Sequence, residues 1–238
     1  LDMPYYYTWV MPVFHDETSG DYYFGMVHKT YGVAVWNSGT RRWRYLRTET
    51  DREAELNTYD IFKDGNGVIW VATGGRGLWY VDRKNNVLKP FSPPDKHHPA
   101  LWNGTVYKIF EDSRKNLWIG TGRYGLACMD SSRRQVIYYE NIPGDTATLM
   151  AGTHFRTIEE DRYGRIWIGC HTGFCIFDPS SGKFSRNIAR KVYETGIKPG
   201  DTYSIVKDTA GDMWMTVTGQ GLVRVAEKKK GEFRFKVF

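Results

Sequence analysis

The sequence predicts an all-β fold built from repeated four-stranded antiparallel sheets, and three observations support this prediction. The chain has 238 residues, of which 25 are glycine and 16 are tyrosine, a composition that favours strands joined by tight turns. Tryptophan recurs with intervals of 48, 49 and 47 residues, at Trp70, Trp118, Trp167 and Trp214. No segment has a convincing helical period of apolar residues. A fixed period of this length indicates a repeat architecture.

Each tryptophan belongs to the same local pattern. An aspartate lies six residues before it and a glycine six or seven residues after it, while a weaker upstream copy has Asp16, Gly20 and Tyr23 in the tryptophan position. We expect these residues to be architectural: the aspartate accepts turn N–H groups, the indole fills the space between sheets, and the glycine starts the next strand tightly. The aspartates are Asp64, Asp112, Asp161 and Asp208, and the glycines are Gly77, Gly125, Gly173 and Gly221.

One copy, residues 58–91, justifies the four strands in order. The β-prone runs "TYDIFKD", "VIWVAT", "LWYVD" and "VLKPF" are separated by the turn sequences "GNG", "GGRG" and "RKNN". These glycines do not form a Walker phosphate loop, because the required lysine and the following helix are missing. Four strands in a repeat of about 48 residues are typical of a β-propeller blade. We therefore expect five blades, at 7–48, 57–92, 104–140, 153–188 and 201–238, in a single domain over 1–238 or an excised block of blades.

Two further positions of the repeat allow predictions about backbone conformation and solvent exposure. A glycine suited to positive φ follows the aspartate by three residues at Gly67, Gly164 and Gly211, but Lys115 takes this place in one copy. A polar side chain recurs next to the core isoleucine of the first strand, where we expect a solvated central channel. The polar residues at this position are Asp60, Lys108, Thr157 and Ser204.

The charge of the chain excludes few classes of partner. The 33 basic and 27 acidic residues give a net charge of +6, which is compatible with nucleic acid or anionic glycans, but the excess is mild and spread along the chain. We expect a solvated surface, no direct contact with nucleic acid, and a solvated turn at "EKKKGE", Glu227 to Glu232.

The three cysteines, Cys128, Cys170 and Cys175, predict no disulfide framework and no paired zinc site. Cys170 and Cys175 could face each other across a hairpin, although we expect buried thiols.

The copies resemble the two-component regulator propeller repeat, approximately I-x-x-D-x-x-G-x-[IL]-W-I-G-T-x-x-G-L-x-x-[YF]-D. The copies that match this pattern best are "IFEDSRKNLWIGTGRYGLACMD" at 109–130 and "IEEDRYGRIWIGCHTGFCIFD" at 158–178. The copy at 61–82 matches nearly as well. The last copy keeps the spacing but has Ala226 in place of the final aspartate. The resemblance implies the periplasmic sensor of a Bacteroidetes hybrid two-component system, with a membrane helix and a histidine kinase elsewhere in the polypeptide. It also implies signalling by an oligosaccharide, a homodimer, and a segment with no cofactor and no catalysis of its own.

The chain departs from that family in length. Five repeats stand where seven or fourteen are usual, and neither kinase motifs nor an apolar run of roughly 18 residues is present. The chain does not begin with Met, so we expect a leader or an upstream domain before it. If the blades do not close, exposed edges invite pairing with another chain. We therefore expect a homodimer through the propeller edges, and membrane contact only through segments outside this sequence.

The turns between the second and third strands differ between copies, so we expect ligand-binding residues there. Aromatic faces stack on sugars and polar ends bind hydroxyl groups, although exposed loop residues would look the same. His97 and His98 have the look of a metal site but lack partners, so no metal is expected. A propeller lyase or glycoside-active enzyme and a protein-interaction scaffold remain the alternatives. The expected ligand-binding residues are Arg76, Arg123, Tyr124, His171 and Gln220 in the turns, and Trp102 and His154 in the longer connections.

Overall fold

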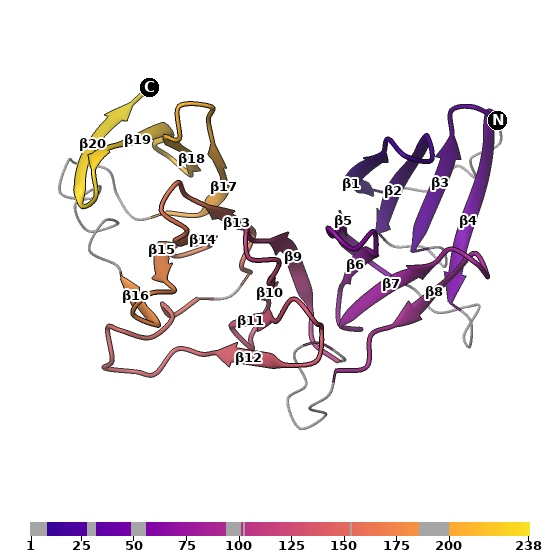
Figure 1. Cartoon of the computed structure of the whole chain (residues 1–238), viewed down its shortest axis with the longest axis horizontal. Helices are drawn as coiled ribbons and strands as arrows, with labels where there is room; N and C mark the ends of the chain where they lie inside the picture. The colour runs from indigo at the N-terminus through magenta and orange to yellow at the C-terminus, as the bar shows by residue number, and fades with distance from the viewer. Residues whose placement is uncertain are drawn as a thin grey trace. The chain divides into compact units, whose positions relative to one another are not determined.

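The computed structural model describes residues 9–27, 32–48, 56–93, 101, 103–152, 154–185 and 200–238 (Figure 1). Over these ranges the elements are strands, and none of the described segments is a helix that could cross a membrane. The chain divides into two compact units, Leu1–Ile109 and Phe110–Phe238. The predicted all-β architecture of four-stranded antiparallel sheets is confirmed, while the division into domains stays a prediction.

Unit one contains two sets of four strands. The first comprises β1 (Trp9–Asp16), β2 (Asp21–Val27), β3 (Val33–Asn37) and β4 (Arg42–Thr48), and the second comprises β5 (Thr58–Lys63), β6 (Ile69–Thr73), β7 (Leu78–Asp82) and β8 (Val87–Pro90). Neighbours in each set pair antiparallel in chain order. In addition, β4 and β8 pair in parallel, which joins the two sets into one eight-stranded sheet.

The remaining strands form three four-stranded sheets, and the boundary between the units falls inside the first strand, β9 (Val106–Glu111). The first sheet also has β10 (Leu117–Thr121), β11 (Leu126–Met129) and β12 (Val136–Tyr139). The second comprises β13 (Thr157–Glu160), β14 (Ile166–Cys170), β15 (Gly173–Asp178) and β16 (Lys183–Ser185). The third comprises β17 (Thr202–Lys207), β18 (Met213–Val217), β19 (Gly221–Lys229) and β20 (Glu232–Val237).

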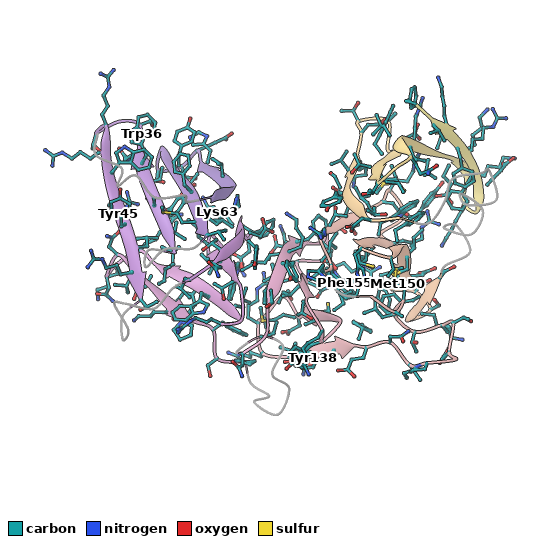
Figure 2. All side chains as sticks on the ribbon, turned by 180° about the vertical axis from the view of Figure 1, so that it is seen from behind. Trp36, Tyr45, Lys63, Tyr138, Met150 and Phe155 are labelled. Atoms are coloured by element: carbon teal, nitrogen blue, oxygen red, sulfur yellow. The ribbon has the colours of Figure 1, made fainter. Side chains whose placement is uncertain are left out.

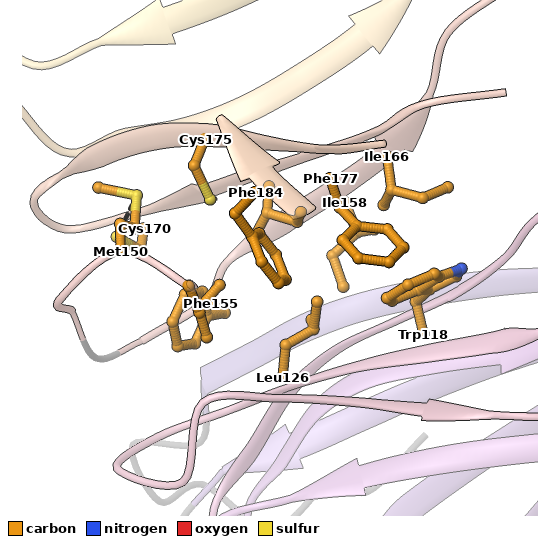
Figure 3. Packing of buried hydrophobic residues seen from close by; sticks show 12 residues of the cluster. Trp118, Leu126, Met150, Phe155, Ile158, Ile166, Cys170, Cys175, Phe177 and Phe184 are labelled. Atoms are coloured by element: carbon orange, nitrogen blue, oxygen red, sulfur yellow. Dashed lines mark hydrogen bonds between the residues drawn. The ribbon is translucent and has the colours of Figure 1, made fainter. Parts of the chain in front are cut away.

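The repeated aromatic ring lies between neighbouring sheets (Figure 3). Trp118 is 2% exposed and packs with Ile158, Ile166 and Phe177 of the following sheet, with 5.3 Å between its ring and that of Phe177. Trp167 makes the equivalent contacts with the β17–β20 sheet, and Tyr23 does so with β5 and β6 in unit one. The core is therefore a series of layers between sheets, each centred on one ring.

Each repeat aspartate fixes both the turn and the ring. In the third copy, Asp112 Oδ1 accepts N–H bonds from Arg114 and Asn116, and its Oδ2 accepts the indole Nε1–H of Trp118 at 2.9 Å. The same indole bond recurs at 2.9 Å for Trp70 and at 2.8 Å for Trp167 and Trp214. The spacing of six residues thus orients the ring as well as closing the turn.

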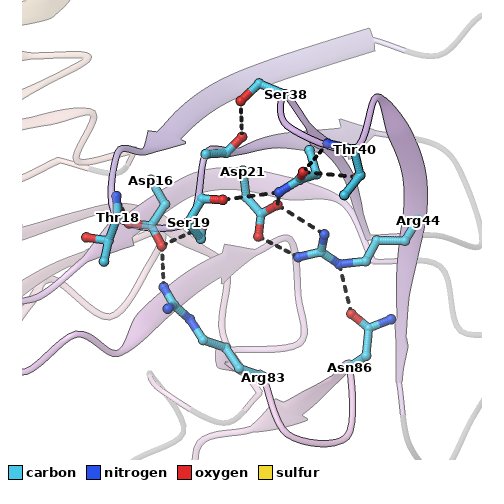
Figure 4. Close-up of polar contacts among 11 residues, drawn as sticks. Asp16, Thr18, Ser19, Asp21, Ser38, Thr40, Arg44, Arg83 and Asn86 are labelled. Carbon is cyan, nitrogen blue, oxygen red and sulfur yellow. Dashed lines mark hydrogen bonds and ion pairs between the residues drawn. The ribbon is translucent and has the colours of Figure 1, made fainter.

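The first copy replaces this bond with ion pairs (Figure 4). Its ring is Tyr23, which has no indole N–H, and Asp16 instead accepts Lys63 Nζ and Arg83 Nη2, each at 2.6 Å. Burial opposes ionisation of Asp16, but the hydrogen bonds and the nearby positive charges outweigh it and lower its pKa to about 2. These pairs bind the turn of the first set of strands to β5 and the β7–β8 turn.

Lys115 adopts the left-handed backbone that glycine adopts in the other copies. Its φ is 68°, beside 82° for Gly67, 74° for Gly164 and 82° for Gly211. A lysine Cβ is strained in this region. The turn geometry therefore persists where the favoured residue is missing, at a cost in stability.

The prediction of a solvated channel is wrong for two of its four polar residues. Asp60 is buried, and its Oδ2 accepts the backbone N–H of Ile109 at 2.9 Å and Lys108 Nζ at 3.0 Å. Thr157 is also buried, and its hydroxyl accepts the N–H of Ile205 at 2.9 Å. Both side chains bind the first strand of the next sheet, because a short polar group at this register can reach its backbone.

The prediction of a solvated "EKKKGE" turn is also wrong in part. Glu227 is 7% exposed and ion-pairs with Arg165, which also binds Asp161 Oδ2 at 2.6 Å. Arg165 is 8% exposed at its side chain and lies 5.6 Å from the ring of Phe233. The glutamate is buried because it neutralises an arginine that the preceding sheet presents. The cysteines behave as expected: Cys170 and Cys175 are buried free thiols.

Candidate functional site

The turns between second and third strands share one edge with the connections that lead into the first strands. In unit two, the N–H of Phe155 donates to Thr121 O, that of Arg156 to Gly169 O at 3.0 Å, and that of Thr218 to Asp201 O at 3.0 Å. We refer to residues 121–125, 149–152, 154–156, 170–173, 200–203 and 218–220 as the turn edge. Each connection is thereby fixed to the turn of a neighbouring strand pair, so the side chains of this edge rest on rigid backbone.

Gly125 shows how tightly the edge is built. Its φ is 74°, and a Cβ there would lie 2.2 Å from the carbonyl oxygen of Tyr139. The turn is closed by Thr121, whose hydroxyl donates to Gly125 O at 2.7 Å. Only glycine fits this position, so the adjoining Arg123 and Tyr124 are held by a backbone with little freedom.

Two histidines meet on the turn edge. The rings of His154 and His171 lie edge to face with their centroids 5.9 Å apart. Burial lowers the pKa of His154 and the positive charge of Arg156 and the His171 ring lower it further, while Asp201 acts in the opposite direction. His154 also has a φ of 59°, an uncommon conformation for a residue other than glycine. Such strain occurs at binding sites, where the fold holds a side chain in one orientation.

Arg156 lies beside the histidines with part of its hydrogen-bonding capacity unused. Its guanidinium lies 4.4 Å from the ring centroid of Tyr203, which is 52% exposed. Its Nε is 3.5 Å from Asp201 Oδ1, an ion-pair distance too long for a good hydrogen bond. Within the described part of the chain, neither of these two buried atoms has a hydrogen-bond partner. The two side chains are therefore held as an ion pair and not as a hydrogen-bonded pair.

A cavity of about 170 Å³ opens on the same edge. Leu149, Met150 and Phe155 give it an apolar wall, and all three belong to the buried cluster around Trp118. Figure 2 labels Met150 and Phe155 among the side chains of the chain. Arg123 and Glu140 also line it, and the guanidinium of Arg123 lies 5.4 Å from the ring of Tyr124. The cavity thus combines apolar surface with one charge of each sign.

A larger cavity, of about 270 Å³, lies at the opposite edge of the same sheets, beside the first turn. Its two carboxylates are already engaged, because Asp112 holds Trp118 and the turn, and Asp130 accepts hydrogen bonds from Ser132 and Gln135. It also borders Cys128, whose thiol pKa is raised to about 12 by burial and nearby carboxylates. Two of the carboxylates that line this cavity therefore have structural roles.

The structure brings together some of the predicted ligand-binding residues. Arg123, Tyr124, His154 and His171 lie on the turn edge of unit two, and Gln220 lies on its 218–220 turn, half-buried, with its N–H donating to Val217 O. Arg76 belongs to unit one, where it is exposed and its carbonyl accepts the indole N–H of Trp79 at 2.8 Å. Trp102, His97 and His98 lie outside the described residues.

Sequence reasoning missed Arg156, Asp201, Tyr203 and Glu140. A signal for Arg156 exists, because the repeats align it with Tyr59, Tyr107 and Tyr203 at the start of the first strand. In unit one the rings of Tyr59 and Tyr107 lie 5.0 Å apart, whereas Arg156 stacks on Tyr203 in unit two. An arginine among tyrosines at a shared position marks a local departure from the repeat.

The side chains of the turn edge suit the binding of a polar ligand. No group of three metal-ligating side chains occurs in the described ranges. The thiol of Cys170, next to His171, has a pKa raised by burial, which disfavours the nucleophilic thiolate. The edge instead offers cations, imidazoles, an exposed phenol ring and a small cavity, which together suit a polar ligand with apolar faces.

Comparison with known proteins agrees with the fold. A model of the two-component regulator propeller matches residues 100–123 and 150–172, whereas no curated protein sequence matches the chain. Two solved structures described as extracellular domains of hybrid two-component systems of B. thetaiotaomicron have TM-scores of 0.70 and 0.71, at 18% and 20% identity. They cover 96% and 95% of this chain, which spans only 28% and 30% of theirs.

An enzyme also shares the architecture. Virginiamycin B lyase from Staphylococcus aureus has a TM-score of 0.67 at 13% identity over 96% of this chain and 69% of the lyase. Identities this low establish the fold alone. The chain is an all-β propeller fragment that contains two-component regulator propeller repeats.

Proposed function

We propose that this chain is a non-catalytic, extracytoplasmic ligand-binding part of a hybrid two-component sensor and that it responds to an oligosaccharide. The observation that carries the proposal is the turn edge of unit two, where repeats of a sensor family present Arg123, His154, Arg156 and His171 beside the exposed ring of Tyr203. Sugars offer C–H faces to aromatic rings and hydroxyl groups to charged and amide side chains. This chain spans under a third of the similar extracellular domains, so the sensor we propose contains further extracellular segments, and the kinase and the membrane helix would lie elsewhere in the polypeptide.

A lyase is the second candidate. In the Staphylococcus aureus lyase, replacement of one histidine by alanine leaves the enzyme catalytically inactive. The His154–His171 pair gives this chain imidazoles that could move a proton. The sensor is favoured because the repeats match a sensor family and because Cys170, the thiol next to His171, is held protonated by burial.

We also propose that the chain forms a homodimer through a sheet face. The outer face of the β17–β20 sheet carries Val206, Leu222 and Phe238, which are 52%, 36% and 57% exposed, around the half-buried Trp214. The equivalent face of the preceding sheet, around Trp167, is covered by its neighbour. Light scattering tests this: Phe238→Glu is expected to shift a dimer toward monomer, and a wild-type chain that stays monomeric at high concentration contradicts the proposal.

Titration calorimetry against a panel of oligosaccharides, with analysis of the products, tests the function. Saturable binding without turnover supports the sensor. Turnover of any bound saccharide would establish an enzyme instead. The His154→Gln, His171→Asn double variant separates these outcomes further, since it should abolish turnover by a lyase but only weaken binding by a sensor. If no oligosaccharide of the panel binds, the oligosaccharide proposal is overturned.

A further inference from the structure

The turn edge of unit two gathers four nitrogen-bearing side chains that can carry positive charge. The rings of His154 and His171 are 5.9 Å apart, Arg156 lies close enough to His154 to affect it electrostatically, and Arg123 lines the cavity walled by Phe155. We propose that the ligand of this edge is an anionic saccharide, recognised through a carboxylate or sulfate group bound between Arg156 and the two histidines. This inference rests on the proposed oligosaccharide binding and names the chemistry that selects the sugar.

Arg156 is the main anchor for the anion. Its side chain is 33% exposed, and its Nε lies 3.5 Å from the carboxylate of Asp201, too far for a good hydrogen bond. An oxyanion that reaches the guanidinium from solvent would form a charge-assisted hydrogen bond with it, which is stronger than a neutral one. The ring of Tyr203 supports the guanidinium from one side at 4.4 Å, so the group keeps its orientation.

The cavity suits one ring or substituent and not a whole oligosaccharide. Its volume of about 170 Å³ falls below the roughly 300–1,000 Å³ of pockets that enclose complete ligands. Its wall of Leu149, Met150 and Phe155 matches the C–H face of a sugar ring. Glu140 lines the same cavity and repels an anion, which places the charged substituent on the side of Arg156 and the histidines.

The histidines set the sign of the charge on this edge. Arg123 and Arg156 carry two positive charges, and Glu140 and Asp201 carry two negative ones, so these four side chains cancel. Protonation of His154 then makes the edge cationic. The pKa of His154 is lowered by burial and by the nearby Arg156 and His171, so the positive charge of His154 and the anion affinity should grow as the pH falls below the ordinary histidine pKa of about 6.5.

The equivalent position in unit one lacks this character. Tyr59 and Tyr107 occupy the place of Arg156, and their rings pack against each other at 5.0 Å. The turn that corresponds to His171 holds Gly75 and Arg76, and the N–H of Gly75 donates to the hydroxyl of Thr105 at 3.1 Å. The combination of an arginine with two imidazoles is therefore particular to unit two within the described residues.

Calorimetry with matched saccharides tests the inference on the full chain. The probes are trigalacturonic acid with its carboxyl-reduced counterpart, and a sulfated disaccharide with its desulfated form, so the two pairs distinguish carboxylate from sulfate recognition. Each titration is run at constant ionic strength near pH 5 and near pH 7.5, because the pKa of His154 lies below the ordinary histidine value of about 6.5. Inorganic sulfate serves as a control for binding of the anion alone.

At least one anionic probe should bind about tenfold more tightly than its neutral counterpart, as expected for one charge-assisted hydrogen bond, and more tightly at the lower pH. Arg156→Gln should remove most of this preference, and His154→Gln should remove its pH dependence. Lys228→Gln, which deletes an exposed positive charge at the other end of β19, should leave both unchanged. Equal binding of charged and neutral partners overturns the inference but leaves the oligosaccharide sensor standing. Failure of all four probes, together with a silent neutral panel, overturns both.

Discussion

Replacing Trp118 or Trp214 by alanine tests whether the repeated indole stabilises the protein through contact with the next sheet. The two residues occupy the same repeat position and make the same indole bond to aspartate, at 2.9 Å and 2.8 Å. Trp118 is 2% exposed and packs on Ile158, Ile166 and Phe177, whereas Trp214 is half-buried against Phe238 and the guanidinium of Arg224. They differ mainly in whether a following sheet covers the ring.

The expected costs differ by about a factor of two. Trp118→Ala removes a fully buried ring, for which losses of about 3–5 kcal/mol are usual. Trp214→Ala removes a ring that keeps part of its surface in water, so the transfer term shrinks and a loss of about 1–2 kcal/mol is expected. Loss of the indole bond contributes about 1 kcal/mol to each and cancels in the comparison.

Urea unfolding followed by circular dichroism measures both costs, at a protein concentration where the chain is monomeric. The matched variants Trp118→Phe and Trp214→Phe remove the indole bond while keeping an aromatic ring, and their costs should be similar to each other. Equal losses for the two alanine variants would refute packing between sheets as the source of the difference. A loss below about 1 kcal/mol for Trp118→Ala would refute its place in the core.

Three further changes probe turns, ion pairs and pH. Lys115→Gly should stabilise unit two by about 0.5–1 kcal/mol, because it relieves the strain of a φ of 68° and loses only an exposed 3.4 Å ion pair with Glu111. A lower melting temperature of this variant would contradict the backbone strain assigned to Lys115. Glu227→Ala should lower the free energy of unfolding by about 3 kcal/mol or more, because Arg165 then stays buried with one carboxylate partner fewer. Glu227→Gln should cost less. Equal urea midpoints for the wild type and both variants would show that the pair is unimportant. Unit one should lose stability as the pH falls from about 4 toward 2, because Asp16 has a folded pKa of about 2, below its unfolded value of about 3.9. Asp16→Asn should flatten that acid dependence of the melting temperature, and an unchanged slope would count against the Lys63 and Arg83 pairs as its cause.

The sequence predicted the strands and turns well because those features are local. The turn after Asp64 and the left-handed position shared by Gly67 and Lys115 depend on residues within a few positions of one another. The parallel pairing of β4 with β8 was not predictable in this way, since it depends on two strands about 40 residues apart meeting at their ends. The burial of Glu227 has a similar origin, because its partner Arg165 lies 62 residues away.

The candidate site was predicted only in outline. His154 and His171 were expected on the loops, and the structure brings them together. Arg156 was overlooked because it directly precedes a strand of the repeat. Its place in the candidate site depends on its contacts with Asp201 and Tyr203, which belong to the next repeat. Asp60 and Thr157 were read as channel residues because polarity in a sequence does not distinguish solvent from a buried backbone N–H.

Hydrogen exchange with and without a bound oligosaccharide locates the binding site most directly. The two cavities of unit two lie at opposite edges of the same sheets, so their protection patterns do not overlap. Binding at the turn edge predicts slower exchange at 121–125, 149–152, 154–156 and 170–173, with little change at 112–116 and 130–137, which border the larger cavity. Protection confined to 112–116 and 130–137 would contradict the assignment of the turn edge as the ligand-binding surface.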